Sequence, residues 1–189
     1  MTHTTTTIAE NEYLRFVQRD DWSWVERKNV NGIVCIVSCT NEGNVLLVEQ
    51  YRPPVDCRVI EFPAGLSGDF ADQPDEALEK AAQRELLEET GYRAQRMMRK
   101  TAVTSSAGLT NEVVTMFIAE GLDKVGEGGG DESEDIQIHE VPLHDVDNWP
   151  DRAQVAGKLV DGRVYAGLYF LQQKASNGDT SHGPGIAEE

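Results

Sequence analysis

Three glutamates near the middle of the chain have a spacing that could bind a metal ion. They are Glu85, Glu88 and Glu89, in the run RELLEETG. If this run is helical, residues three and four positions apart lie on one side of the helix, so the three carboxylates project together. Converging carboxylate oxygens are the ligands that Mg²⁺ requires, and Mg²⁺ in turn bridges phosphate oxygens. The pattern therefore indicates magnesium chemistry on a phosphorylated substrate.

A solvated acidic face is the alternative interpretation, since neighbouring like charges on an isolated helix repel. Two features favour the metal site. The same stretch supplies apolar residues that would dock the helix on a core, and Arg84 could hold the acids by charge-assisted hydrogen bonds. The apolar residues are Leu78, Ala81, Ala82 and Leu86.

The elements that must position these residues are readable from the pattern. We expect a helix over residues 74–90, because Pro74 suits a first turn and Gly91 suits a C-terminal stop. Residues 160–174 have the apolar spacing of a second helix that packs on a sheet. Apolar runs bounded by turn residues predict strands at 32–39, 45–51, 58–62, 113–119 and 136–143. The order indicates a mixed β-sheet packed against helices, class α+β or α/β.

The central run resembles the Nudix box. Glu76 is followed, after seven residues, by Arg84-Glu85-Leu86-Leu87-Glu88-Glu89-Thr90-Gly91-Tyr92, and every fixed position of the box from Glu76 onward matches. The first glycine of the box would fall at Phe70, so its equivalent here is Gly65, with five inserted residues. The resemblance implies the α/β/α Nudix sandwich, an α+β fold, and structural roles for Glu76, as a helix cap, and Arg84, which orients the acids.

Two further runs, EQYRPP and EFPAG, resemble the ADP-ribose pyrophosphatase branch of that family. The branch implies that the carbonyl of Ala64 joins Glu85, Glu88 and Glu89 in holding Mg²⁺, with Mn²⁺ as a substitute ion. It also implies that Arg52 and Glu61 lie near the substrate. For Arg52 the alternative is an ordinary surface charge.

Three other positions follow from the resemblance. An N-terminal tryptophan of the branch stacks on adenine, often across a dimer interface, and Trp24 suits that role better than Trp22, although ordinary packing is the alternative. In the run SSAGLTNE, Gly108 is expected near the substrate, but Ala107 stands where the branch has a proline. Glu134 matches the acid of a mobile loop that acts as general base or positions water, and the neighbouring acids Asp131, Glu132 and Asp135 are the alternatives.

The expected activity is hydrolysis of the pyrophosphate bond of ADP-ribose or a related nucleoside diphosphate sugar, giving AMP (NMP) and a sugar phosphate. Metal-bound water would attack one phosphorus while a carboxylate accepts its proton. Arg84, Glu85, Glu88, Glu89 and Glu134 are the catalytic candidates. Two alternatives stay open: a hydrolase that prefers a GDP- or UDP-sugar, and a non-catalytic Nudix-fold binding protein.

The composition disfavours two classes of binding partner, nucleic acids and membranes. The 189 residues carry a formal net charge of −16, which disfavours nucleic acid, and no apolar run is long enough to span a membrane. We expect a cytoplasmic homodimer that acts on a small molecule. Its expected organisation is disorder over residues 1–11, an arm over 12–30 that dimerises and binds the base, a Nudix domain over 31–175, and a disordered tail over 176–189.

Overall fold

The computed structural model describes residues 4–68, 74–130 and 134–178. The strands of this part of the chain form three sheets, two in the body and one in an N-terminal arm. The first body sheet has the order β7 (Ala64–Ser67), β4 (Gly32–Ser38), β9 (Val113–Lys124), β8 (Tyr92–Thr104), and only its β4–β9 pair is parallel. The second has the order β10 (Gln137–Pro142), β5 (Asn44–Arg52), β6 (Cys57–Glu61), β11 (Leu159–Val160), and its β6–β11 pair is parallel.

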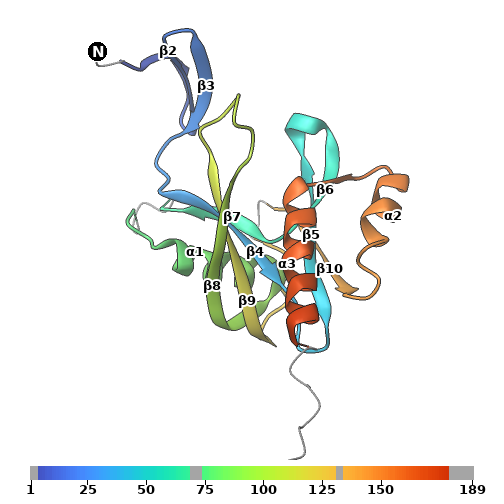
Figure 1. The fold of residues 1–189 in the computed structure, drawn as a ribbon. Coiled ribbons are helices and arrows are strands. Elements are labelled where there is room, and N and C mark those ends of the chain that lie inside the picture. Colours follow the sequence, from blue (N-terminus) through green and yellow to red (C-terminus); the bar gives the residue numbers. More distant parts are fainter. Residues whose placement is uncertain (1–3, 69–73, 131–133, 179–189) are drawn as a thin grey trace, which may run out of the picture.

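Helices lie on both sides of these strands. Helix α1 (Leu78–Thr90) and helix α3 (Gly162–Gly178) flank the sheets on opposite sides (Figure 1). The short α2 (Trp149–Val155) and the single turn η1 (Pro53–Val55) complete the described helices. The expected mixed α+β architecture is confirmed.

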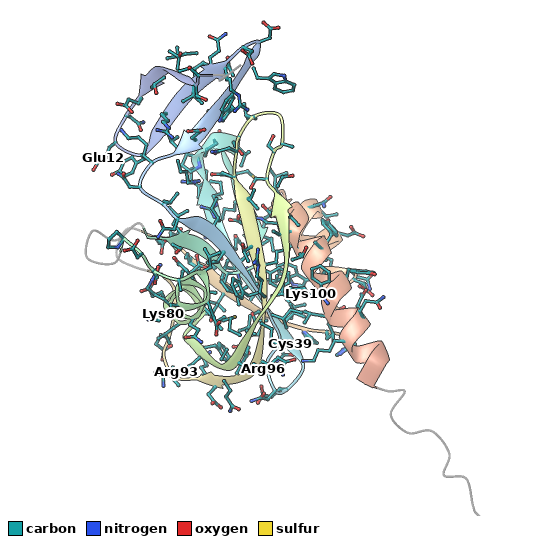
Figure 2. The ribbon with its side chains drawn as sticks, turned by 60° about the vertical axis from the view of Figure 1, so that its left-hand side comes forward. Glu12, Cys39, Lys80, Arg93, Arg96 and Lys100 are labelled. Atoms are coloured by element: carbon teal, nitrogen blue, oxygen red, sulfur yellow. The ribbon has the colours of Figure 1, made fainter. Side chains whose placement is uncertain are left out.

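Successive side chains of β4 point to opposite faces of the sheet, and both faces are buried, which explains why the strand is apolar throughout. Val34 and Ile36 pack in one buried cluster with residues of α1, whereas Cys35 and Val37 pack in a second cluster with residues of α3. A strand that is covered on both faces reads as a continuous apolar run. The spacing of Val164, Leu168 and Leu171 was expected to dock the last helix, and all three side chains are buried in the second cluster. Lys100 of β8 lies beside α3, with its Nζ 5.2 Å from the centre of the Phe170 ring (Figure 2).

The arm is a three-stranded antiparallel sheet of β1 (Thr6–Glu10), β2 (Leu14–Arg19) and β3 (Trp22–Arg27). It stands away from the body, with Glu12 in its first turn (Figure 2). The expectation of disorder over residues 1–11 is therefore wrong for Thr6–Glu10. The β-branched residues of this stretch favour an extended chain, and β2 supplies its hydrogen-bonding partner.

Other boundaries also differ from expectation. Helix α1 begins at Leu78, not at residue 74, because the carbonyl of Glu76 accepts a hydrogen bond from Ser67 Oγ at 2.6 Å and ties this stretch to β7. Helix α3 extends to Gly178, past the expected domain end at 175, while residues 179–189 of the expected tail lie outside the described chain. Strand β8 and helix α2 were not anticipated. None of the helices in the described ranges is long and apolar enough to cross a membrane.

Candidate active site

The end of helix α1 is the centre of the site. Ala81, Ala82 and Leu86 bury one side of the helix, which turns the glutamates toward β7 and the neighbouring loops. Gly91 ends the helix in the left-handed conformation at φ +74, and its N–H donates to the carbonyl of Leu87 at 2.8 Å. Glycine adopts this conformation without the steric cost of a Cβ, so the predicted C-terminal stop is confirmed.

Glu85 lies directly against Gly65. A Cβ built on Gly65 would lie 2.0 Å from the carboxyl carbon of Glu85, so no larger residue fits without moving that side chain. The required glycine stands where the displaced first glycine of the box was expected, before the inserted residues. The insertion falls within residues 66–75, of which 69–73 lie outside the described chain.

Glu89 is the most buried of the three helix carboxylates, with 3% of its surface exposed. Its Oε2 accepts a hydrogen bond from the backbone N–H of Ala64 at 3.1 Å. Burial, followed by the charge of Glu85, raises the pKa of Glu89 well above its usual range, and the Ala64 N–H only partly opposes this. Glu89 is therefore a carboxylate in a place where a negative charge is unstable by itself.

Arg84 links the helix acids to β7. Its Nη1 donates to Glu85 Oε1 at 2.9 Å and to Glu88 Oε2 at 3.0 Å, and its Nη2 donates to the carbonyl of Leu66 at 2.9 Å. The guanidinium also forms two bonds of 3.1 Å to the carboxylate of Glu76. Burial opposes the charge of Arg84, but its bond to Glu76 and its other carboxylate partners raise the pKa above its ordinary value.

The expected cap role of Glu76 is not found. The residue before the helix is Ala77, and no side-chain cap is present at this helix start. The Glu76 carboxylate instead accepts two hydrogen bonds from Arg84. Arg84 also donates to Glu85 and Glu88, which is the geometry that its expected role of orienting the acids requires.

A cleft of about 770 Å³ opens beside these residues. Six of the residues that the sequence singled out line it: Arg52, Glu61, Ala64, Gly65, Glu85 and Glu134. They come from β5, β6, β7, α1 and the segment before β10, so the fold gathers positions from residue 52 to residue 134. Arg84, Glu88, Glu89, Trp24 and Gly108 do not line this cleft.

Glu61 is held between two arginines at the cleft wall. Its Oε2 accepts from Arg52 Nε at 2.7 Å, and its Oε1 accepts from Arg163 Nη2 at 3.2 Å. Asp161 also binds Arg163, and this hydrogen bond raises the pKa of the guanidinium above its ordinary value. Glu61 is 4% exposed, so it acts mainly on the two guanidinium groups.

Arg163 is a cleft residue that sequence reasoning missed. One signal was present: it follows Gly162 in the first turn of α3, where the helix dipole disfavours a cation. A cation in that position needs a partner, and Asp161 and Glu61 supply it.

The glycine-rich segment before Glu134 is attached to the end of α1. The N–H of Gly129 donates to the carbonyl of Glu89 at 2.9 Å, and that of Gly130 donates to the carbonyl of Glu88 at 3.0 Å. A Cβ on Gly130 would lie 2.4 Å from Glu134 Oε2. The segment was expected as a mobile loop; its described residues, 126–130, lack regular secondary structure but bond to the helix end. Residues 131–133 lie outside the described chain.

Trp24 lies in strand β3 of the arm, and Gly108 lies in a turn of the body that β3 contacts. The Nε1 of Trp24 donates to Glu26 Oε1 at 2.7 Å, and the guanidinium of Arg19 lies 5.3 Å from the ring centre. Gly108 is exposed, in the turn between β8 and β9, and a Cβ there would meet nothing within 4 Å. Strand β3 contacts this turn through the N–H of Val25, which donates to the carbonyl of Leu109 at 2.8 Å.

The carboxylates of this region fit a divalent cation by their charge. In the described parts of the chain, no three His, Cys, Asp or Glu side chains are already gathered around one point. However, burial and the charges of Glu85, Glu134 and Glu61 all raise the pKa of Glu89. Glu89 so placed is ionised only when a nearby positive charge offsets its burial and these repulsions, and hard oxygen donors suit Mg²⁺ or Mn²⁺.

Comparison with known proteins identifies the family. Residues 29–161 match the NUDIX domain. The ADP-ribose pyrophosphatase of Bacillus subtilis (strain 168) is 33% identical over 144 residues, which cover 76% of this chain and 73% of that protein. The uridine diphosphate glucose pyrophosphatase of Mus musculus is 29% identical over 184 residues, covering 80% of this chain and 82% of that one. A crystal structure of an ADP compounds hydrolase shares the fold, with a TM-score of 0.69, 19% identity and 93% of each chain covered.

The chain therefore belongs to the Nudix family, and it is a hydrolase of that family. The matched region begins just before β4 and ends after β11, so it contains both body sheets, α1 and all of the residues that line the cleft except Arg27 and Arg163. The arm precedes it and α3 follows it.

Proposed function

We propose that this hydrolase cleaves the pyrophosphate bond of ADP-ribose or a related nucleoside diphosphate sugar, with Mg²⁺, and releases AMP (NMP) and a sugar phosphate. The observation that carries the proposal is the composition of the cleft. Glu85 and Glu134 face the same cavity as the guanidinium of Arg52, so acids that can bind metal lie beside a cation that can bind phosphate. The relative from Bacillus subtilis, named as an ADP-ribose pyrophosphatase, supports the same choice.

The proposed roles follow from the contacts. The carboxylates of Glu85, Glu88 and Glu89 and the carbonyl of Ala64 would hold Mg²⁺, which when bound neutralises the diphosphate and lowers the pKa of a water. Glu134 accepts the proton of the attacking water. Arg52 orients the diphosphate while Glu61 fixes the guanidinium, and Arg84 keeps two of the helix carboxylates in place.

The other end of the substrate is proposed to lie outside this single-chain cleft. Trp24 does not line the cleft. Arg27, at the end of β3, does line it, whereas the rest of the arm stands away from the body (Figure 2). We propose a homodimer in which the arm of one subunit brings Trp24 to the base-binding end of its partner's site, while Gly108 borders the substrate.

A different nucleotide sugar is the second candidate. Ala107 replaces the proline expected for the ADP-ribose branch, and one relative is named as a uridine diphosphate glucose pyrophosphatase. One assay separates the candidates: release of nucleoside monophosphate from ADP-ribose, a UDP-sugar and a GDP-sugar, each with Mg²⁺ and with EDTA. We expect the highest kcat/KM for ADP-ribose. A tenfold preference for a non-adenine substrate, about 1.4 kcal/mol in transition-state binding, would replace the first candidate by the second.

A further inference from the structure

Arg58 joins a buried carboxylate to the residue that follows Glu134. It lies in β6, and its Nε donates to Glu49 Oε1 at 2.7 Å. On its other side, Nη1 donates to Asp135 Oδ2 at 2.8 Å and Nη2 donates to the backbone carbonyl of Asp135 at 3.2 Å. One guanidinium thus binds both the side chain and the main chain of Asp135. None of Arg58, Glu49 and Asp135 lines the cleft.

The inner end of this chain of contacts is fixed. Glu49 is 1% exposed, and its Oε2 also accepts from Lys158 Nζ at 2.6 Å and pairs with His139 Nε2 at 2.8 Å. A buried carboxylate with three such partners has little freedom to move. Arg58 is therefore bound to a carboxylate of β5 that β10 and the segment before β11 also bind. Its guanidinium is fixed in place, and it restricts the position of Asp135 in turn.

The outer partner of Arg58, Asp135, is next in sequence to Glu134, which lines the cleft. Asp135 itself is mostly exposed, and exposed ion pairs contribute little to stability. Holding the carbonyl and the side chain of Asp135 at once, however, restricts the backbone at the neighbouring residue, whose carboxylate faces the cleft. On the other side of Glu134, Gly130 is bonded to the end of α1.

We propose that Arg58 is a positioning residue that sets the place of the Glu134 carboxylate in the cleft by fixing Asp135. The inference rests on the proposed function only in giving Glu134 the role of proton acceptor. It follows that loss of the link should lower turnover more than stability or substrate binding.

The test uses the full chain and two ways of cutting the link. Arg58→Gln removes the guanidinium. Because that change also takes one partner from Glu49, Asp135→Ala is the second variant. It removes the side-chain part of the link, keeps the bond from Arg58 Nη2 to the carbonyl of residue 135, and leaves the Arg58–Glu49 pair intact. Arg152→Gln is the matched control, since Arg152 pairs with Asp145 at 2.6 Å in another exposed ion pair that is not part of the cleft.

For Arg58→Gln we expect kcat for ADP-ribose to fall about tenfold or more, the size usual for groups that orient a reacting residue. For Asp135→Ala we expect a smaller fall, because the main-chain bond remains, and KM should change less than twofold in both. In a Glu134→Gln background the same changes should add less than twofold, because they act through Glu134. Arg152→Gln should match the unmodified enzyme, and the melting temperatures of Arg152→Gln and Asp135→Ala should stay within about 3 °C. Arg58→Gln should melt lower, because it takes a partner from the buried Glu49. Unchanged kcat in both link variants, or losses that multiply with that of Glu134→Gln, would overturn the proposal.

Amide hydrogen exchange supplies a readout that needs no substrate. Peptides that contain Asp135 should exchange faster in Arg58→Gln and Asp135→Ala, and at the original rate in Arg152→Gln. Unchanged exchange in both link variants contradicts the inference even if no nucleotide sugar is hydrolysed. Faster exchange in a protein that hydrolyses none of the panel would instead reject the proposed function and retain the link.

Discussion

At Glu89, burial and the charges of neighbouring carboxylates act in the same direction and against ionisation. Glu89→Gln keeps the shape of the side chain and removes the charge. If Glu89 holds Mg²⁺, turnover should fall about 100-fold or more while the fold survives, because metal stabilisation of the transition state is worth several kcal/mol. Glu79→Gln, on the exposed side of the same helix, is the control. Near-normal Mg²⁺-dependent hydrolysis by Glu89→Gln would contradict the assignment of the helix face.

The raised pKa of Glu89 also predicts how stability depends on pH when metal is absent. Folding raises this pKa, so the stability contributed by the bound proton is present below the ordinary carboxyl pKa and is lost as pH rises through the raised value. Glutamine cannot ionise. In EDTA, the melting temperature of Glu89→Gln should therefore exceed that of the unmodified protein at alkaline pH, and the gap should narrow on acidification. If the difference in melting temperature between the two proteins were the same at all pH values, ionisation of Glu89 would not destabilise the fold.

The site residues that spacing alone could predict are those whose partners are close in the chain, whereas Arg52, Glu61 and Glu134 were expected only from the family resemblance. The box acids and Arg84 occupy one helix, so their type and spacing already define their common face. Arg163 binds Glu61 from 102 positions away, and Arg58 binds Asp135 from 77 positions away. No local sequence pattern predicts such ion pairs, because the two partners come together only when the sheets have formed.

At the scale of elements, the junction between α1 and the glycine-rich segment gives a stability prediction. A Cβ on Gly91 would lie 2.1 Å from the carbonyl oxygen of Gly126, and Gly91 has φ +74. Gly91→Ala should lower the free energy of unfolding by more than about 1 kcal/mol, from backbone strain and from displacement of residues 126–130. Gly157→Ala is the matched control, because Gly157 has φ +81 but open space around it. Denaturant titration should show the larger loss for Gly91→Ala; equal losses would mean that the packing contributes nothing.

The turn between β8 and β9 gives a prediction on substrate range. The N–H of Leu109 donates to the carbonyl of Ser106 at 2.9 Å, so Ala107 occupies the second position of a β-turn, where proline is favoured. Ser105 and Glu112, on either side, line the cleft. Ala107→Pro should stiffen this border and narrow the range of nucleotide sugars without raising the overall rate. We would measure kcat/KM for ADP-ribose, a UDP-sugar and a GDP-sugar in both forms; unchanged ratios would exclude this turn from substrate selection.

Elements were predictable where burial leaves a periodic pattern. Strands β4, β5, β6, β9 and β10 and helix α3 were expected within a few residues, because their apolar runs face the two buried clusters. Strand β8 was missed because it is rich in arginine and mostly exposed, and it depends on its long pairing with β9. Strand β1 was missed for a similar reason, since all five of its residues are exposed and its strand pairing is with β2.

At the scale of the whole molecule, the arm exposes more apolar surface than a free monomer would be expected to leave in water. Five large apolar side chains of the arm are exposed: Ile8, Tyr13, Leu14, Phe16 and Trp22. By the strand register, Leu14 and Phe16 lie on one face of the arm sheet and Trp22 on the other, so apolar side chains are exposed on both faces, as is typical of an interaction surface. We predict that light scattering will show a homodimer. Phe16→Asp with Trp22→Asp should yield monomers, whereas Val155→Asp, at a 90% exposed position of α2, should not.

Mixing two defective subunits tests whether the arm completes the partner's site. Trp24→Ala removes the proposed base contact, and Glu89→Gln removes a proposed metal ligand. If the arm crosses the interface, a mixed dimer has one site in which both residues are intact. Random exchange makes half of the dimers mixed, so activity should recover to about a quarter of the unmodified level at substrate concentrations below KM. If Trp24 served its own subunit, no site in the mixture would have both residues, and activity would stay at the average of the two variants. A fully active monomer at assay concentration would likewise remove the dimer from the proposed function.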